Sequence, residues 1–301
     1  MRVLVTGSDG FVGRWLVAHL GDIGDDVVGL DAAIDVTDAA ALREAVVAVE
    51  PDAVVHLAAQ ASVAQSWEQP LATFAVNATG TLHLTEAALA CRRPPRVLLV
   101  GSAEIYGVVG PEDLPLPEDR VLAPVSPYAL SKATAELIGL QAWRSRGLEV
   151  LCARPFNHTG PGQAPGFVVP SLARQIVDSE RCGASFIAVG DISVRRDLTD
   201  VRDVVRAYRL LAERGTPGQS YNVCRGESTE IAEVARRLAA LAGVDLRFVV
   251  DPARLRPVDI TDLRGDPARL REVTGWEPEI ALDQTLADVL ASLAAPTTPT
   301  A

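Results

Sequence analysis

Short runs of β-branched and aliphatic residues alternate along the chain with longer segments whose apolar residues recur every three or four positions. The short runs predict strands, and the longer segments predict amphipathic helices. The strands are expected at about 2–6, 27–30, 53–56, 96–101 and 148–153, and helices near 71–91 and 127–146. Strands that alternate with helices are typical of a parallel sheet with right-handed crossovers. The pattern therefore predicts an α/β fold around a doubly wound parallel sheet.

A glycine-rich turn follows the first predicted strand and precedes the first helical segment. It reads Gly7-Ser8-Asp9-Gly10-Phe11-Val12-Gly13. Gly7 permits a tight turn, Gly10 allows the backbone to approach a pyrophosphate, and Gly13 allows close packing of the helix. The N-terminus of that helix then faces the anion. This order of strand, turn and helix indicates a Rossmann-type dinucleotide site.

Asp31 ends the second predicted strand, where a carboxylate accepts hydrogen bonds from an adenosine ribose. The same carboxylate repels a 2′-phosphate, and no arginine follows it directly. We therefore expect NAD(H) to be preferred, with NADP(H) as the second choice.

Lys132 is the only lysine among 28 basic residues, so it is not an interchangeable surface cation. Ser126 is predicted to cap a helix and Pro127 to be its first residue, which places Tyr128 and Lys132 four positions apart on one face. A compact ammonium can lower the pKa of a nearby phenol. The pair predicts a proton donor for carbonyl reduction, with the phenol pKa lowered by Lys132 and an oxidised nicotinamide.

The glycine turn and the Tyr128-x-x-x-Lys132 pair together resemble the extended short-chain dehydrogenase/reductase family over nearly the whole chain. The resemblance implies catalytic roles for Ser102, Tyr128 and Lys132. For Glu104 it leaves two roles open, a base as in the family's dehydratases or a hydrogen bond to the sugar. Asn77 matches a structural asparagine of the family. The implied cofactor contacts are Gly7, Gly10, Phe11, Val12, Gly13, Asp31, Asp35, Val36, Leu57, Ala58, Ala59, Tyr128, Lys132 and Pro155.

The segment Arg154–Gln163 resembles the corresponding segment of family members that act on GDP-mannose, as dehydratases, or on its 4-keto-6-deoxy derivative, as reductases. The resemblance implies substrate contacts from Ser102, Glu104, Asn157, Val168, Arg174, Arg196 and Arg256. His158 is expected to be a core histidine bonded to backbone rather than a ligand. The acidic, proline-rich stretch 110–119 is expected to be either a surface loop or a lid over the sugar.

The implied reaction is NAD(P)H-dependent reduction of a nucleotide-linked 4-keto-6-deoxyhexose, first of all GDP-4-keto-6-deoxy-D-mannose to GDP-D-rhamnose. A 4-ketoreductase for a dTDP-linked sugar is a near variant. Two hypotheses from different functional classes are a nucleotide-sugar 4,6-dehydratase and a protein that binds a dinucleotide without chemistry.

The alternation of strands and helices weakens from Gly160 onward and returns around 199–223. We expect a dinucleotide-binding Rossmann domain at 1–159, rejoined by 199–223. A smaller C-terminal substrate-binding lobe is expected from 160–198 and 224–294, followed by a flexible tail at 295–301.

The formal charge is −11 and the pI about 4.9, which argues against a nucleic acid or an anionic membrane as partner. No leader or membrane-length apolar run is evident, so a cytoplasmic protein is expected. The four cysteines, Cys91, Cys152, Cys182 and Cys224, lack metal-ligand spacing. We interpret them as buried thiols and expect no metal site.

The two predicted helices carry more apolar residues than one face of a sheet needs. The residues are Leu71, Phe74, Leu82 and Leu89 in the first and Leu130, Leu137, Leu140 and Trp143 in the second. The excess, together with pairing of these helices in similar proteins of the family, predicts a homodimer.

Overall fold

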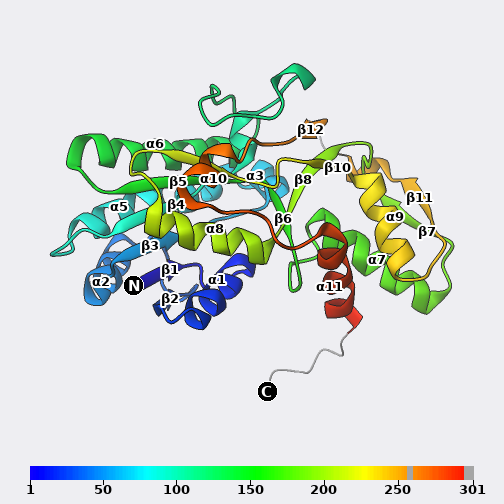
Figure 1. The fold of residues 1–301 in the computed structure, drawn as a ribbon, viewed down its shortest axis with the longest axis horizontal. Helices are drawn as coiled ribbons and strands as arrows, with labels where there is room; N and C mark the ends of the chain where they lie inside the picture. Colours follow the sequence, from blue (N-terminus) through cyan, green and yellow to red (C-terminus); the bar gives the residue numbers. More distant parts are fainter. Residues whose placement is uncertain (256–259, 295–301) are drawn as a thin grey trace.

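The computed structural model describes residues 1–255 and 260–294. Its largest element is a parallel sheet with strand order β2-β1-β3-β4-β5-β9, seen behind the helices in Figure 1. The strands are β1 (Arg2–Thr6), β2 (Asp26–Leu30), β3 (Ala53–His56), β4 (Arg96–Val100), β5 (Val150–Pro155) and β9 (Ser220–Val223). All five pairings are parallel, which confirms the predicted α/β fold with a doubly wound sheet.

Helices cover both faces of this sheet because its strands alternate their apolar side chains between two cores. Val3 and Val5 point into one core, beside α1 (Phe11–Asp22), α8 (Val201–Arg214) and α10 (Ala268–Thr274). Leu4 points into the other, beside α2 (Ala39–Val49), α5 (Gly80–Leu89) and α6 (Pro127–Arg146). A strand buried on both faces reads as a continuous apolar run, as β1 does.

The smaller lobe lies to the right in Figure 1 and has its own core. Its helices are α7 (Val168–Cys182), α9 (Ile231–Leu241) and α11 (Leu282–Ala294). One sheet runs β10 (Ser228–Glu230), β8 (Arg195–Asp200), β12 (Asp262–Leu263), with β6 (Asn157–Thr159) also beside β8. A second sheet pairs β7 (Phe186–Val189) with β11 (Arg247–Val250).

Residues 268–276 pack into the core of the large domain. The predicted smaller lobe, in contrast, includes all of 224–294. Leu270 and Trp276 are fully buried in the same core as Val3 and Tyr208. The Trp276 indole donates a hydrogen bond to the Asp203 carbonyl on α8. The chain therefore returns to the Rossmann sheet twice after residue 199. The predicted tail, 295–301, lies outside the described residues.

The single helix predicted at 71–91 is wrong in one respect, because the segment is broken. It consists of α4 (Pro70–Phe74), a π-helical turn at Ala75–Thr79 and α5, and the short α3 (Val63–Glu68) precedes it. The wide turn contains Asn77, whose side chain bonds to Gln60 and to Ser131 of α6. These bonds hold the Asn77 amide at a position that a regular α-helix would not give it, so they stabilise the π-helical turn.

The prediction of four buried thiols is wrong for one of them. Cys91, Cys152 and Cys224 are buried, whereas Cys182 is exposed at the last residue of α7.

The segment between Tyr106 and Ser126 projects from the top of Figure 1, and its inner half is anchored. Leu116 is fully buried and pairs its backbone with Arg264 and Asp266, just after β12. A 3₁₀ turn at Ala103–Tyr106 precedes the segment, and a second at Pro111–Asp113 lies within it. A third 3₁₀ turn, Pro252–Arg254, follows β11. The loop therefore bridges the large sheet and the smaller one.

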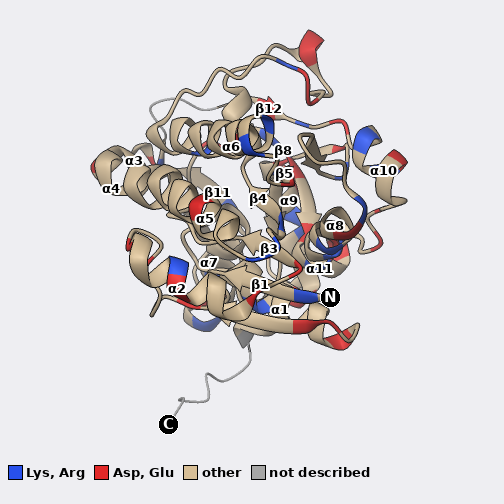
Figure 2. Ribbon diagram, turned by 90° about the vertical axis from the view of Figure 1, so that its left-hand side faces the viewer, with Lys and Arg blue, Asp and Glu red and all other residues tan. Residues whose placement is uncertain are grey.

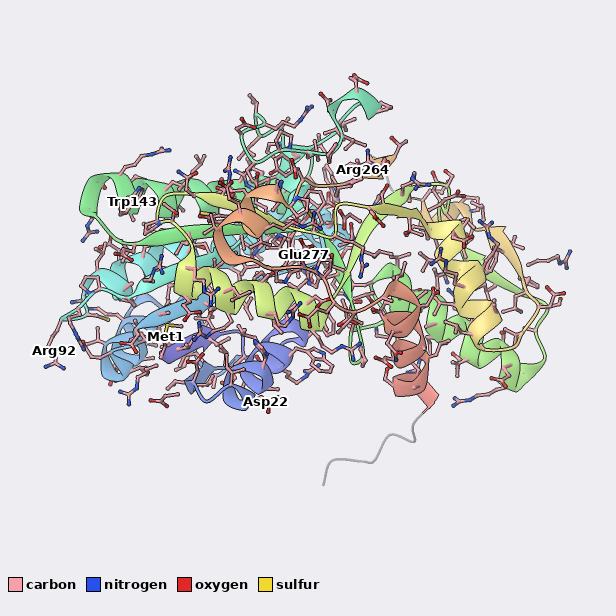
Figure 3. All side chains as sticks on the ribbon, viewed as in Figure 1. Met1, Asp22, Arg92, Trp143, Arg264 and Glu277 are labelled. Atoms are coloured by element: carbon pink, nitrogen blue, oxygen red, sulfur yellow. The ribbon has the colours of Figure 1, made fainter. Side chains whose placement is uncertain are left out.

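The apolar helix faces are only partly used inside the chain. Leu89, Leu140 and Trp143 pack against the core beneath the sheet, and Trp143 lies in the last turn of α6 in Figure 3. Leu71, Leu130 and Leu137 are 86%, 50% and 57% exposed, and Phe74 and Leu82 are exposed as well. Figure 2 shows the neighbouring helices α3, α4, α5 and α6 along one side, with few charges on them.

A buried ion pair joins α6 to β5. Arg154 donates to Glu136 through Nε (3.0 Å) and Nη2 (2.5 Å), and both side chains are almost inaccessible. Arg154 Nη1 also donates to the Tyr106 hydroxyl and to the Glu118 carbonyl, while the Ser220 hydroxyl donates to Glu136. Four separate elements and the projecting loop meet in this network.

We predict that Arg154→Met lowers the free energy of unfolding by ~3–5 kcal/mol, because it leaves the Glu136 carboxylate buried without its cation. Adding Glu136→Leu should recover most of the loss. Urea unfolding followed by circular dichroism measures both. The matched control is Arg120→Met, which breaks the solvent-screened pair with Asp113 and should cost far less stability than Arg154→Met. An equal loss of unfolding free energy in the two single variants would contradict the prediction that the Arg154–Glu136 pair behaves as a buried ion pair.

Candidate functional site

The glycine turn after β1 has no room for side chains. Gly7 has a φ of +67°, and a Cβ on it would lie 2.8 Å from the Ala58 nitrogen. A Cβ on Gly13 would overlap the Gly7 carbonyl oxygen, so Gly13 permits packing of the helix onto the turn itself. Gly10 is the N-cap of α1 and offers only backbone there. The exposed N–H groups at this helix start suit an anion.

Thr6 joins the glycine turn to the segment that follows β3. Its hydroxyl accepts a hydrogen bond from the Ala58 N–H (3.1 Å), and its carbonyl accepts one from the Leu57 N–H. Leu57, Ala58 and Ala59 therefore lie beside Gly7 at the carboxyl edge of the sheet. Thr6 opens the glycine motif that carries the family resemblance, but the sequence alone assigned it no role in the site.

Asp31 follows β2 at the same edge and is exposed. Its carboxylate accepts the Ala33 N–H at 2.9 Å, and the Asp35 carboxylate accepts the Thr37 N–H at 2.8 Å. Hydrogen bonds from Thr37 lower the pKa of Asp35. Val36 is buried against Gly80. Asp31 thus borders the start of α1, where the predicted ribose contact would fall.

Ser102, Tyr128 and Lys132 converge at the carboxyl ends of β4 and β5. Ser126 caps α6 by accepting the Ala129 N–H, so Tyr128 stands in the first turn, as predicted. Ser102 caps the 3₁₀ turn that carries Glu104. Lys132 donates to the Val100 carbonyl at 2.8 Å. Pro155, the last residue of β5, is buried beside this edge.

The pKa of Tyr128 is raised in this structure, whereas the predicted lowering concerns Lys132 and an oxidised nicotinamide acting together. Burial raises the pKa of Tyr128 to about 12; the adjacent Ser102 hydroxyl opposes that rise, and the Glu104 charge adds to it. Burial lowers the pKa of Lys132 to about 8. The lysine therefore does not by itself lower the phenol pKa, and the second cation of the prediction, an oxidised nicotinamide, is needed for that.

His158 packs against the glycine-turn segment. The His158 ring stacks on Phe11 with centroids 6.4 Å apart. Its Nδ1 lies 3.0 Å from the Phe156 carbonyl, and burial lowers the pKa of His158. A neutral ring that donates Nδ1–H to backbone agrees with the predicted core histidine. Asn157 is half-buried on β6, and Val168 begins α7.

The two described arginines of the predicted substrate set differ in availability. Arg174 is half-buried on α7 and has no hydrogen-bond or ion-pair partner within residues 1–255 and 260–294. Arg196 is 6% exposed, and its Nη1 donates to the carbonyls of Arg195 and Ile260. The predicted contact at Arg256 lies outside the described residues.

Three comparisons with known proteins bear on this site. A family model described as GDP-mannose 4,6 dehydratase matches residues 32–289. A GDP-6-deoxy-D-mannose reductase from Pseudomonas aeruginosa is 40% identical over 96% of each chain. The chain belongs to the extended short-chain dehydrogenase/reductase family.

Solved structures of this family superpose closely on the chain. RMD from Pseudomonas aeruginosa, complexed with NADPH, has a TM-score of 0.89 at 39% identity and covers 97% of this chain and 98% of its own. A UDP-glucose 4-epimerase from Thermus thermophilus, complexed with NAD, has a TM-score of 0.88 at 31% identity, covering 97% and 99%.

No group of three His, Cys, Asp or Glu side chains in 1–255 and 260–294 lies close enough to hold a metal ion. None of the helices in that part of the chain is both long and apolar enough to cross a membrane.

We predict that Lys132→Met stabilises the ligand-free protein at pH 7. The folded-state pKa of about 8 lies below the ordinary 10.5, so burying the ammonium carries a penalty that is fully present below pH 8 and falls as pH rises from 8 to 10.5. The gain should be on the order of 1–3 kcal/mol, after loss of the bond to Val100. Denaturant unfolding at pH 7 and pH 10.5 checks it. A variant less stable than the parent at pH 7, or a gain unchanged at pH 10.5, would contradict the penalty.

Proposed function

We propose that the protein is an NAD(P)H-dependent reductase of a nucleotide-linked 4-keto-6-deoxyhexose, converting GDP-4-keto-6-deoxy-D-mannose to GDP-D-rhamnose. The convergence of Ser102, Tyr128 and Lys132 beside the glycine turn supports a carbonyl reduction. The identity of 40% over 96% of a GDP-6-deoxy-D-mannose reductase supports the choice of sugar.

The residues around the glycine turn fit a nicotinamide dinucleotide. Gly7 and Gly10 leave backbone accessible at the turn, Gly13 is buried against it, and the start of α1 is free of side-chain caps. We assign the pyrophosphate to this turn and the adenosine ribose to Asp31. Phe11, Val12, Val36 and the 57–59 backbone would flank the cofactor, with Asp35 and Pro155 at the two ends of the site. When bound, the cofactor supplies the hydride for the ketone carbon.

Tyr128 is the proposed proton donor to the ketone oxygen. Its phenol is neutral at pH 7 because burial holds the pKa near 12, so the proton is present when the substrate arrives. Ser102 orients the carbonyl by hydrogen bonding, and the phenolate that forms would be stabilised by the buried Lys132 ammonium together with an oxidised nicotinamide. Lys132 would also hold the nicotinamide ribose.

The substrate diphosphate is assigned to Asn157, Arg174 and Arg256, with Arg196 shaping the site through its carbonyl bonds. Arg174 is the best-supported of the described candidates, because a half-buried guanidinium that has no partner among residues 1–255 and 260–294 gains most from an anion. Val168 would contact the nucleotide beside it.

Glu104 favours a second candidate, a 4,6-dehydratase. Its carboxylate is close enough to raise the pKa of Tyr128, and the matching family model is that of a dehydratase. A dehydratase needs a base at sugar C5, whereas a reductase needs only a hydrogen bond from this position. Ala103 supplies no second acid beside it, which favours the reductase.

We expect oxidation of NADH or NADPH with GDP-4-keto-6-deoxy-D-mannose and formation of the 4-hydroxy sugar, identified by NMR. Tyr128→Phe should lower turnover at least ~100-fold while cofactor binding persists, since a proton-transfer group contributes about 10²–10⁴-fold. Incubation with GDP-mannose alone tests the dehydratase hypothesis. A dTDP-4-keto-6-deoxyhexose tests which nucleotide base the enzyme prefers. Turnover of GDP-mannose to its 4-keto derivative, or undiminished turnover by Tyr128→Phe, would overturn the proposal.

Cofactor choice is expected to follow Asp31, whose carboxylate favours a free 2′-hydroxyl. We predict a higher kcat/KM for NADH than for NADPH, although a similar protein has been solved with NADPH. Asp31→Ala should move the ratio toward NADPH. Asp22→Ala, at the far end of α1 (Figure 3), is the matched control and should leave the ratio unchanged. A tenfold preference of the parent for NADPH would refute the assignment.

We propose a homodimer formed through α4, α5 and α6. Trp67, Leu71, Phe74, Val125 and Leu130 line an apolar hollow of about 420 Å³ on this side. Isologous pairing is the commonest closed assembly and would cover these exposed side chains.

Light scattering at micromolar concentration should give twice the chain mass of 31.9 kDa. Leu71→Arg should shift the mass to that of one chain, because it places a charge in the covered face. Val250→Arg, at an exposed apolar position on β11, is the control and should leave the mass unchanged. A parent mass near that of one chain would reject the dimer.

A further inference from the structure

His56, the last residue of β3, is a buried side chain that the mechanism above does not use. It is 5% exposed, and its Nδ1 lies 2.8 Å from the Thr6 hydroxyl. Burial and the neighbouring Lys132 charge lower the pKa of His56 to about 3, so the ring is neutral at physiological pH. A neutral imidazole has one N–H donor and one acceptor nitrogen.

The bonds of Thr6 decide which ring nitrogen carries the proton. The Thr6 oxygen already accepts the Ala58 N–H, and the only described acceptor near its own hydroxyl proton is His56 Nδ1. Thr6 therefore donates to Nδ1, and the imidazole proton sits on Nε2. Within the described residues, Nε2 is buried and has no hydrogen-bond partner.

A small cavity of about 10 Å³ adjoins His56. Its lining includes His56, Asn77, Thr81, Lys132, Glu136 and Cys152. A cavity of this volume accommodates about one water molecule, provided that polar groups surround it. A polar occupant is favoured over an apolar one, because an imidazole, an ammonium and a carboxylate line the cavity.

Lys132 also lines this cavity, and its ammonium has N–H donors that need an acceptor there. Its ammonium has three N–H donors, and the described partner is the Val100 carbonyl. His56 Nε2–H and Lys132 Nζ–H are both donors, so they cannot bond to each other. A water oxygen accepts from both at once.

We propose that one internal water molecule occupies this cavity and accepts hydrogen bonds from His56 Nε2 and Lys132 Nζ, so that His56 is a positioning residue for the lysine. The water solvates the buried ammonium, and His56 keeps the water in place. The consequence for activity rests on the proposed role of Lys132 in reduction, whereas the presence of the water does not.

A crystal structure of the unsubstituted protein at about 1.5 Å tests the site directly. We expect a density peak within hydrogen-bonding distance, about 3.2 Å, of both Nε2 and Nζ. No peak, or a peak bonded to only one of the two nitrogens, would overturn the proposal whether or not the protein reduces a ketosugar. A peak in a protein without reductase activity would support the water and refute the proposed function instead.

Two variants separate positioning from general packing. His56→Gln can keep an amide donor where Nε2 lies, whereas His56→Asn keeps a partner for Thr6 and loses the donor into the cavity. Loss of the water should lower the pKa of Lys132, so the alkaline limb of the kcat profile for His56→Asn should move down by about one pH unit. His56→Gln should retain the limb of the parent. Identical limbs for both folded variants, or a shift in His56→Gln alone, would refute the positioning role.

Discussion

The buried pair of Glu136 and Arg154 is the interaction on which the catalytic face of α6 depends. Tyr128, Lys132 and Glu136 follow one another at four-residue spacing, so fixing Glu136 fixes the rotation of the helix about its axis. Arg154 is the residue before Pro155 at the end of β5, and it holds Glu136 with two hydrogen bonds. The ion pair thereby aligns the helix with the strand edge where reduction is proposed to occur.

Such a pair contributes orientation more than stability. Burying two charges costs about as much as their attraction returns, and the remaining polar atoms must be satisfied as well. Here Tyr106, Ser220 and Glu118 supply those bonds. Tyr106 in turn donates to Asn222 on β9, whose amide donates to the Leu116 carbonyl of the projecting loop. The network therefore ties the helix, the sheet edge at β5 and β9, and the loop into one arrangement.

The site itself works against folding. The buried ammonium raises the energy of the ligand-free protein, as the pKa of Lys132 near 8 indicates, whereas the Tyr128 phenol, with its pKa near 12, is neutral at pH 7 and carries no such penalty. Both shifts reflect loss of water around groups that would be paired in a loaded enzyme. Strain of this kind is typical of sites arranged for a bound partner rather than for the free chain.

Much of the fold was predictable because local rules and tertiary structure agree. The glycine turn, the Ser126 cap and the alternating strands follow from short-range sterics and periodicity. The π-helical turn at Asn77 was not, because it depends on bonds to Gln60 and Ser131, the latter 54 residues away. The shared core of Trp276 with β1 likewise depends on distant packing. Arg196 was expected to meet phosphate from its motif alone, and its carbonyl bonds could not be read from sequence.

The anchoring of Leu116 beside Arg264 and Asp266 has a mechanical consequence. The loop that contains Leu116 starts just after the turn bearing Ser102 and ends at Ser126, one residue before α6. This loop is bonded near its midpoint to the smaller lobe, and its two ends join the supports of Ser102 and Tyr128. A movement of that lobe would therefore reach both supports together. Closure of the lobes around a sugar would therefore move hydroxyl and phenol in concert and conserve the spacing between them.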